Sequence, residues 1–362
     1  MAIKFVFVQL GSFTPNYLAG NLKRLSIIFP NNEIYLITNN KELLKLAIKN
    51  LSIVKYSTSS KHELILDKLS SKIDFREGFW RLSLERLLAF TKFQIQNKMD
   101  HLLHLESDVL IFPNIPLGLI QQQNKLLWCQ YNSKLDVASL LYSPNFQSAS
   151  YLQQKIENHL ELNKSHTDMT LLSSIRRDSG PMISLFPSLS SAESHLVNPK
   201  SEITLDSCIY LSSQSKIFGG IFDPAAIGVW LLGKNLENTN AVSILHDRWI
   251  IESGDSYVDP SRIDFLFKPG GLLVFIENGE EIPIFNLHVH SKDFKLLNLD
   301  WEREIDKYVK LSRDKLPIKK FSIKIFIALV KLNFKRKNLV EFIATMPWIY
   351  SIRMKIRKTL RG

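Results

Sequence analysis

Residues 3–10 read IKFVFVQL, an apolar run rich in strand-favouring residues that stops at Gly11 and Ser12. A helical pattern of leucines follows, and two further apolar runs come next, EIYLIT at residues 33–38 and a shorter one at residues 52–56. This alternation predicts an α/β fold with a mainly parallel sheet covered by helices, because parallel strands need a crossover between them. Ligands of such folds bind at the carboxyl ends of the strands.

The rest of the chain carries further helix and strand signals. Helical spacing of apolar residues predicts a long helix over residues 79–97. Strands are expected at residues 101–105, 126–130 and 216–222, a helix at 223–232, turn-rich loops at 143–150 and 187–194, and hairpins within 263–290. We expect the compact domain to span residues 1–300 and a basic helical extension to span residues 301–362.

The net positive charge of the chain comes from residues 302–362. The net charge is +11, from 46 Lys and Arg against 35 Asp and Glu. Residues 302–362 hold 17 of the basic and 5 of the acidic residues, which leaves 29 basic against 30 acidic in residues 1–301. A protein that binds nucleic acid through its main fold would spread basic residues over that fold. We therefore expect no nucleic-acid partner.

Two carboxylates interrupt an apolar stretch, HLLHLESDVLIF, at residues 101–112. In an extended chain, Glu106 and Asp108 project to the same face. Neighbouring like charges in apolar surroundings are costly unless a cation or hydrogen-bond donors compensate them. A hard divalent cation such as Mn²⁺ or Mg²⁺ is a natural partner. The alternative is a strand end whose acids are solvated or paired with lysine.

A second cluster, NLHVHSK at residues 286–292, places His288, His290 and Lys292 on one face if the chain is extended. Imidazole can complete a carboxylate metal site, and an ammonium group suits a phosphate. The alternative is that these histidines are structural. Together the two clusters describe a site for a metal ion and a diphosphate.

These clusters, with FGGIFDPAAIGVWLLG at residues 218–233, resemble the nucleotide-sugar-dependent glycosyltransferases of the GT-A fold, most closely bacterial enzymes of surface polysaccharide or lipopolysaccharide synthesis. In the DxD motif of that family, Glu106 takes the first position. The resemblance implies a Rossmann-like, mixed but mainly parallel sheet flanked by helices. It also implies metal-dependent transfer of a sugar, expected to be a hexose, from a nucleotide-diphosphate donor, with a UDP-sugar favoured, to a glycan or lipid-linked acceptor.

The same resemblance assigns residues to the site. It implies Mn²⁺ or Mg²⁺ bound by Glu106, Asp108 and His288 or His290. It implies a donor site that includes Gln9, Gly11, Ser12, Arg81, Arg86, Ser107, Gly220 and Lys292. For the two arginines the alternative is a surface ion pair, since Arg81 and Glu85 stand four residues apart on the expected helix.

The catalytic carboxylate has two candidates. An inverting reaction needs a base for the acceptor hydroxyl, and a retaining one needs a group that stabilises the sugar cation. Asp168 and Asp223 are the candidates, and each could instead cap a helix, because an apolar helical run follows both. The sequence leaves this choice, and the stereochemistry, open.

Residues 313–362 interleave basic residues with apolar and aromatic ones, which favours a helix lying in an anionic membrane interface. The alternative is a helix packed on the body with a solvated charged face. Only Cys129 and Cys208 are present, and we find neither an export signal nor a membrane span, so we expect a cytoplasmic protein, peripheral on the inner face of the cell membrane. Two other functions are a scaffold without turnover and, less favoured, a nucleic-acid-binding protein that uses the tail.

Overall fold

The computed structural model describes residues 2–69, 78–162, 166–232, 256–268, 271–290 and 309–311. All of them belong to one compact unit, Met1–Leu316. Lys292 and the basic segment 313–362 lie outside the described residues, so the expectations about them, and the expected domain boundary at residue 300, stay predictions.

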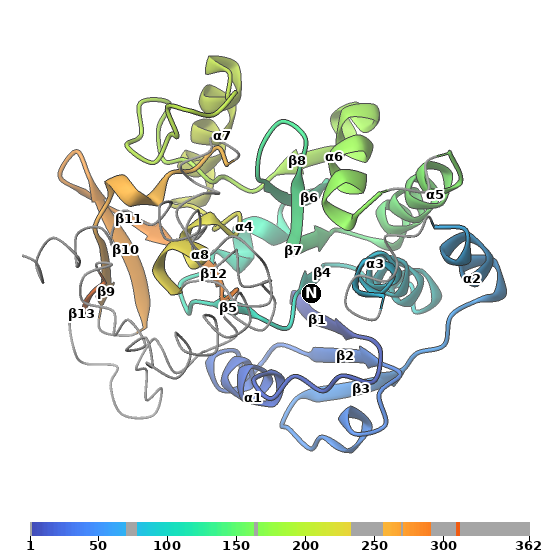
Figure 1. The fold of residues 1–362 in the computed structure, drawn as a ribbon. Coiled ribbons are helices and arrows are strands. Elements are labelled where there is room, and N and C mark those ends of the chain that lie inside the picture. The colour runs from blue at the N-terminus through green and yellow to red at the C-terminus, as the bar shows by residue number, and fades with distance from the viewer. Residues whose placement is uncertain are drawn as a thin grey trace, which may run out of the picture. The chain divides into compact units, whose positions relative to one another are not determined.

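A seven-stranded sheet forms the centre of the fold (Figure 1). Its strands are β1 (Lys4–Gln9), β2 (Ile34–Thr38), β3 (Leu51–Lys55), β4 (Leu102–Leu105), β6 (Leu126–Gln130), β7 (Asp136–Ser143) and β8 (Ile183–Leu185), in the spatial order β3-β2-β1-β4-β7-β6-β8. Of these, only β7 runs antiparallel to its neighbours β4 and β6. The expected mixed, mainly parallel α/β sheet is therefore confirmed.

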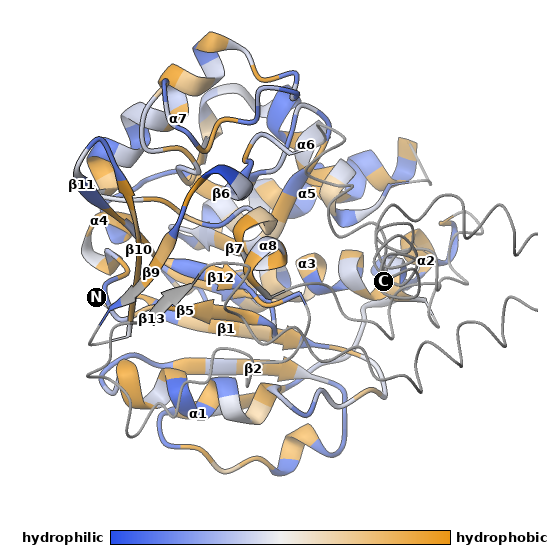
Figure 2. Cartoon of the chain, turned by 60° about the vertical axis from the view of Figure 1, so that its left-hand side comes forward, coloured by the Kyte–Doolittle hydropathy of each residue, from blue (hydrophilic) through white to orange (hydrophobic). Residues whose placement is uncertain are grey.

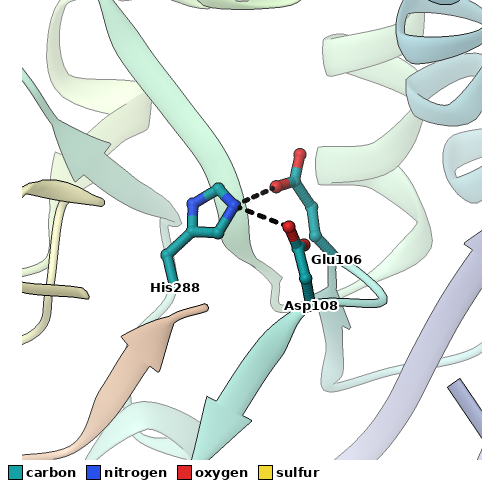
Figure 3. Close-up of side chains that lie close together, drawn as sticks. All are labelled: Glu106, Asp108 and His288. Carbon is teal, nitrogen blue, oxygen red and sulfur yellow. Dashed lines mark hydrogen bonds and ion pairs between the residues drawn. The ribbon is translucent and has the colours of Figure 1, made fainter. Parts of the chain in front are cut away.

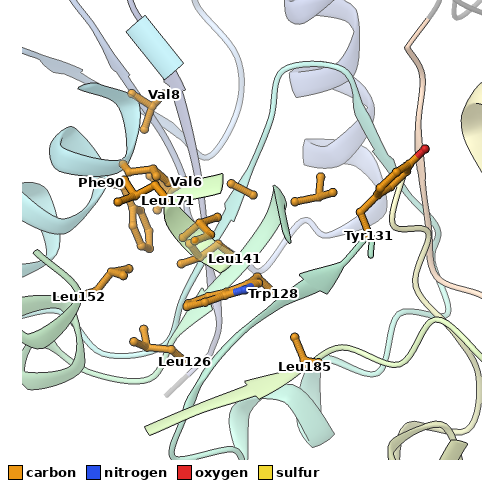
Figure 4. Packing of buried hydrophobic residues seen from close by; sticks show 14 of the residues in the cluster. Val6, Val8, Phe90, Leu126, Trp128, Tyr131, Leu141, Leu152, Leu171 and Leu185 are labelled. Carbon is orange, nitrogen blue, oxygen red and sulfur yellow. The ribbon is translucent and has the colours of Figure 1, made fainter. Parts of the chain in front are cut away.

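Helices cover both faces of this sheet, because its strands alternate apolar side chains between two layers of core. Phe5 and Phe7 pack on the side of α1 (Leu18–Ile28), whereas Val6 and Val8 pack on the side of α3 (Phe79–Gln96). In Figure 2 the strands β1 and β2 are largely apolar, while α1 alternates apolar and polar residues. The second layer of core includes Phe90, Trp128 and Leu152 (Figure 4).

The remaining helices surround this frame. They are α2 (Ser60–Asp67), α4 (Leu117–Gln121), α5 (Phe146–Leu162), α6 (Asp168–Ser179), α7 (Leu205–Phe218) and α8 (Ala226–Leu232), with 3₁₀ turns η1 (Leu43–Lys45), η3 (Gly180–Met182) and η6 (Pro260–Arg262). The helices expected at residues 79–97 and 223–232 are confirmed as α3 and α8. None of the helices in the described part of the chain combines the length and apolar character needed to cross a bilayer.

Two smaller sheets complete the structure. One contains β11 (Glu280–Ile284), β10 (Leu272–Glu277), β9 (Phe265–Lys268) and β13 (Val309–Leu311), all antiparallel. The other pairs β12 (Asn286–His288) with β5 (Val109–Ile111). The expected hairpins are confirmed, and the turn between β10 and β11 has positive φ angles at Asn278 and Gly279, as a two-residue hairpin requires.

Two local expectations are wrong. Residues 216–222 are not a strand, because α7 continues to Phe218 and ends at Gly219 in the left-handed conformation that favours glycine. Beyond it, Ile221 makes an isolated bridge with Ile284. The loop expected at residues 143–150 is shorter, because the Asn145 side chain accepts a hydrogen bond from the Ser148 amide, and α5 begins there.

Candidate functional site

The strand order reverses between β1 and β4. The chain leaves β1 toward β2 on one side, while β4 pairs with β1 on the other side, in parallel. The loops that follow these two strands start from the same edge of the sheet, and doubly wound folds bind ligands at such a switch point, beyond the carboxyl ends of the strands. The loop after β1 holds Gly11, and the turn after β4 holds Glu106 and Asp108.

The two acids are brought together by a turn rather than by an extended chain. The Val109 amide donates to the Glu106 carbonyl oxygen at 3.0 Å, which closes a tight turn over residues 106–109. Asn21 on α1 holds this turn, because its side-chain amide donates to the carbonyl oxygens of Ser107 (3.2 Å) and Val109 (2.8 Å). The Tyr17 hydroxyl lies 3.4 Å from the Ser107 hydroxyl. We expected Glu106 and Asp108 to share one face of an extended strand. The two carboxylates do lie close together, but a turn and not a strand brings them there.

His288 reaches the acids from the other end of the chain. It ends β12, opposite Val109 of β5, so the two-stranded sheet carries its ring to the turn. Its Nε2 lies 3.1 Å from Asp108 Oδ2 and 3.4 Å from Glu106 Oε2, and the three side chains point toward one another (Figure 3). Asp108 and His288 are buried and Glu106 is partly exposed.

This group fits a divalent cation. Within the described ranges, Glu106, Asp108 and His288 form the group of potential ligands whose donor atoms all lie within 4.8 Å of one another. In an octahedral site with ligands at about 2.1 Å, adjacent donors are about 3 Å apart, close to the distances from the imidazole to each acid. Two carboxylates and one imidazole are a donor set that suits Mn²⁺. The arrangement is therefore a candidate metal site, which Ser107 adjoins.

Arg86 on α3 compensates the acids from the other side. Its Nη2 lies 2.5 Å from Glu106 Oε1 and 3.0 Å from Asp168 Oδ2. Burial raises the pKa of Asp168, the Arg86 charge opposes that rise, and the Glu106 charge adds to it. Arg86 therefore stabilises two carboxylates near the end of β4, and the surface ion pair considered for it is not what the structure shows.

Asp168 is the first residue of α6, and Thr167 is its cap. The Thr167 hydroxyl accepts from the Thr170 amide, and the Thr170 side chain accepts from the Thr167 amide. The cap that the sequence left open as an alternative for Asp168 is thus supplied by Thr167. The Asp168 carboxylate accepts from the Met169 amide at 3.0 Å and pairs with Arg86. Its catalytic role stays a prediction.

Asp223 has the geometry of a cap. It is fully buried, Oδ1 accepts from the Ile227 amide at 2.8 Å, and Oδ2 accepts from the Gly228 amide at 2.8 Å. Oδ2 also accepts from the backbone amide of His288 at 3.0 Å. Burial raises the pKa of Asp223, and these backbone hydrogen bonds oppose the rise. The capping alternative is what the contacts show, and a catalytic role for Asp223 stays a prediction.

The loop after β1 is held by two asparagines that sequence reasoning missed. The Gly11 amide donates to Asn39 Oδ1 at 2.9 Å, and Asn40 Nδ2 donates to the Ser12 carbonyl oxygen at 2.9 Å. The Gln9 side chain donates to the Phe13 carbonyl oxygen at 3.3 Å. The Asn39-Asn40 pair directly follows the second apolar run, and that position at a strand end was the available signal.

Other predicted residues lie elsewhere or outside the described ranges. Arg81 pairs with Asp67 on α2 rather than with Glu85. Gly220 lies against β11, where an added Cβ would stand 2.6 Å from the Pro283 carbonyl oxygen, so close packing explains this glycine. The ring centroid of His290 lies 5.8 Å from that of His288, and His290 is not a member of the metal-binding group.

The fold and the site define a doubly wound α/β protein with an acid-and-imidazole group at its switch point. The chain matches no protein-family model and no curated protein. Among solved structures it is similar to the galactosyltransferase LgtC in complex with donor and acceptor sugar analogues, at 15% identity over 51% of this chain and 73% of that one, with a TM-score of 0.38.

Two further structures are similar at the same level. The PaToxG glycosyltransferase aligns at 10% identity over 49% of this chain and 71% of its own, with a TM-score of 0.33. Mouse xyloside xylosyltransferase 1 aligns at 9% identity over 51% of this chain and 85% of its own, with a TM-score of 0.34. Likenesses of this size establish neither a family nor an activity, so the function has to follow from the site itself.

Proposed function

We propose that the protein is a metal-dependent glycosyltransferase that uses a nucleotide-diphosphate sugar. The observation that carries the proposal is the convergence of Glu106, Asp108 and His288 at the carboxyl ends of β1 and β4. The acids follow one strand and the histidine ends another, far along the chain, so three potential ligand atoms converge from segments that are distant in sequence. The sequence resemblance of the same segments to GT-A enzymes supports the proposal.

The chemistry of the site suits departure of a nucleoside diphosphate. A bound divalent cation would stabilise the negative charge that develops on the phosphate oxygens. Glu106 and Asp108 are carboxylates that can hold such an ion, and His288 adds a nitrogen ligand. The loop of Gly11 and Ser12 lies at the neighbouring strand end, where the nucleotide is expected. Lys292, four residues beyond His288, is proposed to meet the diphosphate.

The finer assignments extend this proposal. We propose Mn²⁺ as the ion, a UDP-hexose as the favoured donor, and a glycan or lipid-linked acceptor of cell-surface polysaccharide synthesis. The basic and aromatic composition of residues 313–362 supports work at an anionic membrane surface. The enzyme would then act on the cytoplasmic side, where a nucleotide sugar is available and a lipid-linked acceptor lies in the same interface.

A thermal-shift panel tests the central proposal. The full chain is heated with UDP, GDP or CDP, each with and without Mn²⁺, and sugar-nucleotide hydrolysis is assayed in parallel. A ligand at a hundred times its Kd adds about 2.7 kcal/mol to the free energy of unfolding. We expect a metal-dependent shift with one nucleotide and its loss in Asp108→Ala. No metal-dependent shift with any nucleotide, or an unchanged shift in the variant, would contradict the proposal.

A vesicle experiment tests the membrane assignment separately. Each basic residue near an anionic surface contributes about 1 kcal/mol to binding. Replacing Lys335, Arg336 and Lys337 by glutamine in the full chain should therefore weaken binding to phosphatidylserine-containing vesicles, measured by co-sedimentation, by roughly 100-fold. Vesicles of phosphatidylcholine alone are the control. Equal sedimentation of both proteins with the anionic vesicles would remove the tail from the proposal.

A further inference from the structure

The carboxylate of Asp223 joins two segments that are distant in sequence. Its Oδ2 accepts hydrogen bonds from the Gly228 amide at 2.8 Å and from the His288 amide at 3.0 Å, while Oδ1 accepts from the Ile227 amide. Asp223 is fully buried. An ionised carboxylate in such a position is costly, and it is tolerated when backbone amides satisfy its oxygens.

The same two segments are connected along their length. The Ile221 amide donates to the Pro283 carbonyl oxygen and the Phe285 amide donates to the Ile221 carbonyl oxygen, both at 2.9 Å. The Asp223 amide then donates to the side-chain oxygen of Asn286 at 3.0 Å. The next contact in this series is the one from His288 to Asp223 Oδ2. The series therefore ends at the residue whose ring faces Glu106 and Asp108.

Gly228 holds the same point of the backbone from the other side. A Cβ added to Gly228 would lie 2.1 Å from the His288 carbonyl oxygen and 2.9 Å from Asp223 Oδ2. Both the amide and the carbonyl of His288 are thus fixed by the segment 223–228, the amide by a hydrogen bond and the carbonyl by close packing. Only glycine permits this approach without a shift of the backbone.

We propose that Asp223 is a positioning residue for His288, and that it sets the metal affinity of the site through the backbone of this ligand without touching the ion. The inference rests on the proposed metal-dependent function. His288 is held from two sides, by the segment 223–228 and by the strand pair, beyond which the Val289 amide still donates to the Asp108 carbonyl oxygen at 2.8 Å. Without the Asp223 carboxylate, the end of β12 loses its tie to α8, and the imidazole is placed less firmly beside the two acids.

A carboxylate is needed at this position rather than an amide. Its two oxygens accept three backbone N–H groups, and each oxygen offers two lone pairs. In Asp223→Asn the amide nitrogen must face either the Ile227 N–H or the pair formed by Gly228 and His288. The first orientation keeps the contact to His288, so this variant should retain more metal affinity than Asp223→Ala does.

The test measures Mn²⁺ binding by the full chain with electron paramagnetic resonance. The signal of the free ion gives the Kd, and pulsed measurements detect coupling to a nitrogen ligand. Loss of a residue that orients a metal ligand typically weakens metal binding by about 10- to 100-fold. We expect this loss in Asp223→Ala and in Gly228→Ala, together with loss of the nitrogen coupling. His288→Ala is the reference that lacks the nitrogen ligand.

A second helix cap provides the matched control. The Thr204 hydroxyl caps α7 by accepting from the Ser207 amide, and Thr204 belongs to no part of the site. Thr204→Ala should lower the melting temperature in the manner of a lost cap but leave the Kd for Mn²⁺ and the nitrogen coupling unchanged. In the His288→Ala background, Asp223→Ala should change the Kd by less than about 2-fold, because the ligand through which it acts is absent.

The outcomes separate the two proposals. If the wild-type chain binds no Mn²⁺ with or without nucleotide, the metal-dependent function and this inference both fall. If the wild type shows nitrogen coupling and the Asp223 and Gly228 variants keep it with an unchanged Kd, only the inference is overturned. An undiminished effect of Asp223→Ala in the His288→Ala background would also overturn it. Should Asp223→Ala not fold, Gly228→Ala and Asp223→Asn decide the result.

Discussion

Arg86 on α3 and Glu106 at the end of β4 form an ion pair in which Nη2 of the arginine lies 2.5 Å from Oε1 of the glutamate. The two glutamate oxygens have different partners, because Oε2 lies 3.4 Å from Nε2 of His288. Glu106 could therefore bind a metal ion through Oε2 while Oε1 stays paired with Arg86. The same Arg86 nitrogen also reaches Asp168.

Replacing Arg86 by leucine should destabilise the protein by about 3 kcal/mol at pH 7.5, because two largely buried carboxylates lose their cation. The loss should shrink as the pH falls. Without Arg86 the pKa of Asp168, already raised by burial, rises further, and its cost is relieved when the pH drops through that raised value and the acid takes up a proton. Urea unfolding at pH 7.5 and pH 5 measures both effects.

Arg81→Leu is the control for this prediction. Arg81 pairs with Asp67, which is largely exposed, and exposed ion pairs contribute about 1 kcal/mol or less to the free energy of unfolding. An equal loss of stability at both pH values in Arg86→Leu would show that packing rather than charge accounts for the effect of that substitution.

Asp108→Asn should separate stability from metal binding. In EDTA we expect its free energy of unfolding to lie within about 1 kcal/mol of the wild-type value, because removing one of two neighbouring negative charges offsets lost contacts. With Mn²⁺ at a hundred times its Kd, the wild type should gain about 2.7 kcal/mol and the variant nothing. Differential scanning calorimetry checks this, with Asp67→Asn as the exposed control. A gain in Asp108→Asn equal to that of the wild type would contradict it.

His104 should make the protein less stable in mild acid. Its ring is fully buried on β4, Nδ1 lies 3.0 Å from the Val6 carbonyl oxygen, and burial lowers the pKa to about 3 from 6.5. Below pH 6.5 His104 takes up a proton in the unfolded chain, whereas in the folded chain it does so only near pH 3. The free energy of unfolding therefore decreases as the pH is lowered from 6.5 to about 3. At pH 5 this cost is about 2 kcal/mol.

The comparison is with His104→Leu, which cannot titrate. Between pH 7 and pH 5 the wild type should lose about 2 kcal/mol more than the variant in chemical denaturation. Contributions of the carboxylates are shared by the two proteins and cancel in the difference. Parallel losses would mean that His104 accepts a proton in the folded state.

Asn40→Ala should weaken nucleotide binding without affecting the metal ion alone. Asn40 Nδ2 donates to the Ser12 carbonyl oxygen and to the Thr14 hydroxyl, and its Oδ1 accepts from the Glu42 amide. Losing these bonds should cost about 1–2 kcal/mol of stability and let the loop after β1 move. Isothermal titration calorimetry should show a lower nucleotide affinity and an unchanged Kd for Mn²⁺.

A matched control for this variant is Asn32→Ala. The Asn32 side chain donates to the Ile3 carbonyl oxygen, at the opposite end of β1. It should lose comparable stability but keep the nucleotide affinity. If both variants bind nucleotide as the wild type does, the loop after β1 does not form part of the donor site.

Much of the frame could be predicted from local patterns. The apolar run at residues 3–10 alternates Phe5 and Phe7 with Val6 and Val8, and such a strand can be buried on both faces only if helices cover each face. The failures also have local causes. Ile217 and Phe218 have strand-favouring side chains, but the cap at Thr204 and the glycine that ends α7 make them the last turn of a helix.

The sequence by itself determined which groups were candidates for the site: two acids after a central strand and two histidines near residue 290. It did not determine how they meet. A turn at residues 106–109 replaced the expected extended face, and the pairing of β12 with β5 chose His288 over His290. The tie of Asp223 to His288 and the bridge from Arg86 to Glu106 and Asp168 were also decided only by the tertiary structure. The reason is physical: local patterns follow from neighbouring residues, whereas a metal site depends on distances between segments that only packing brings together.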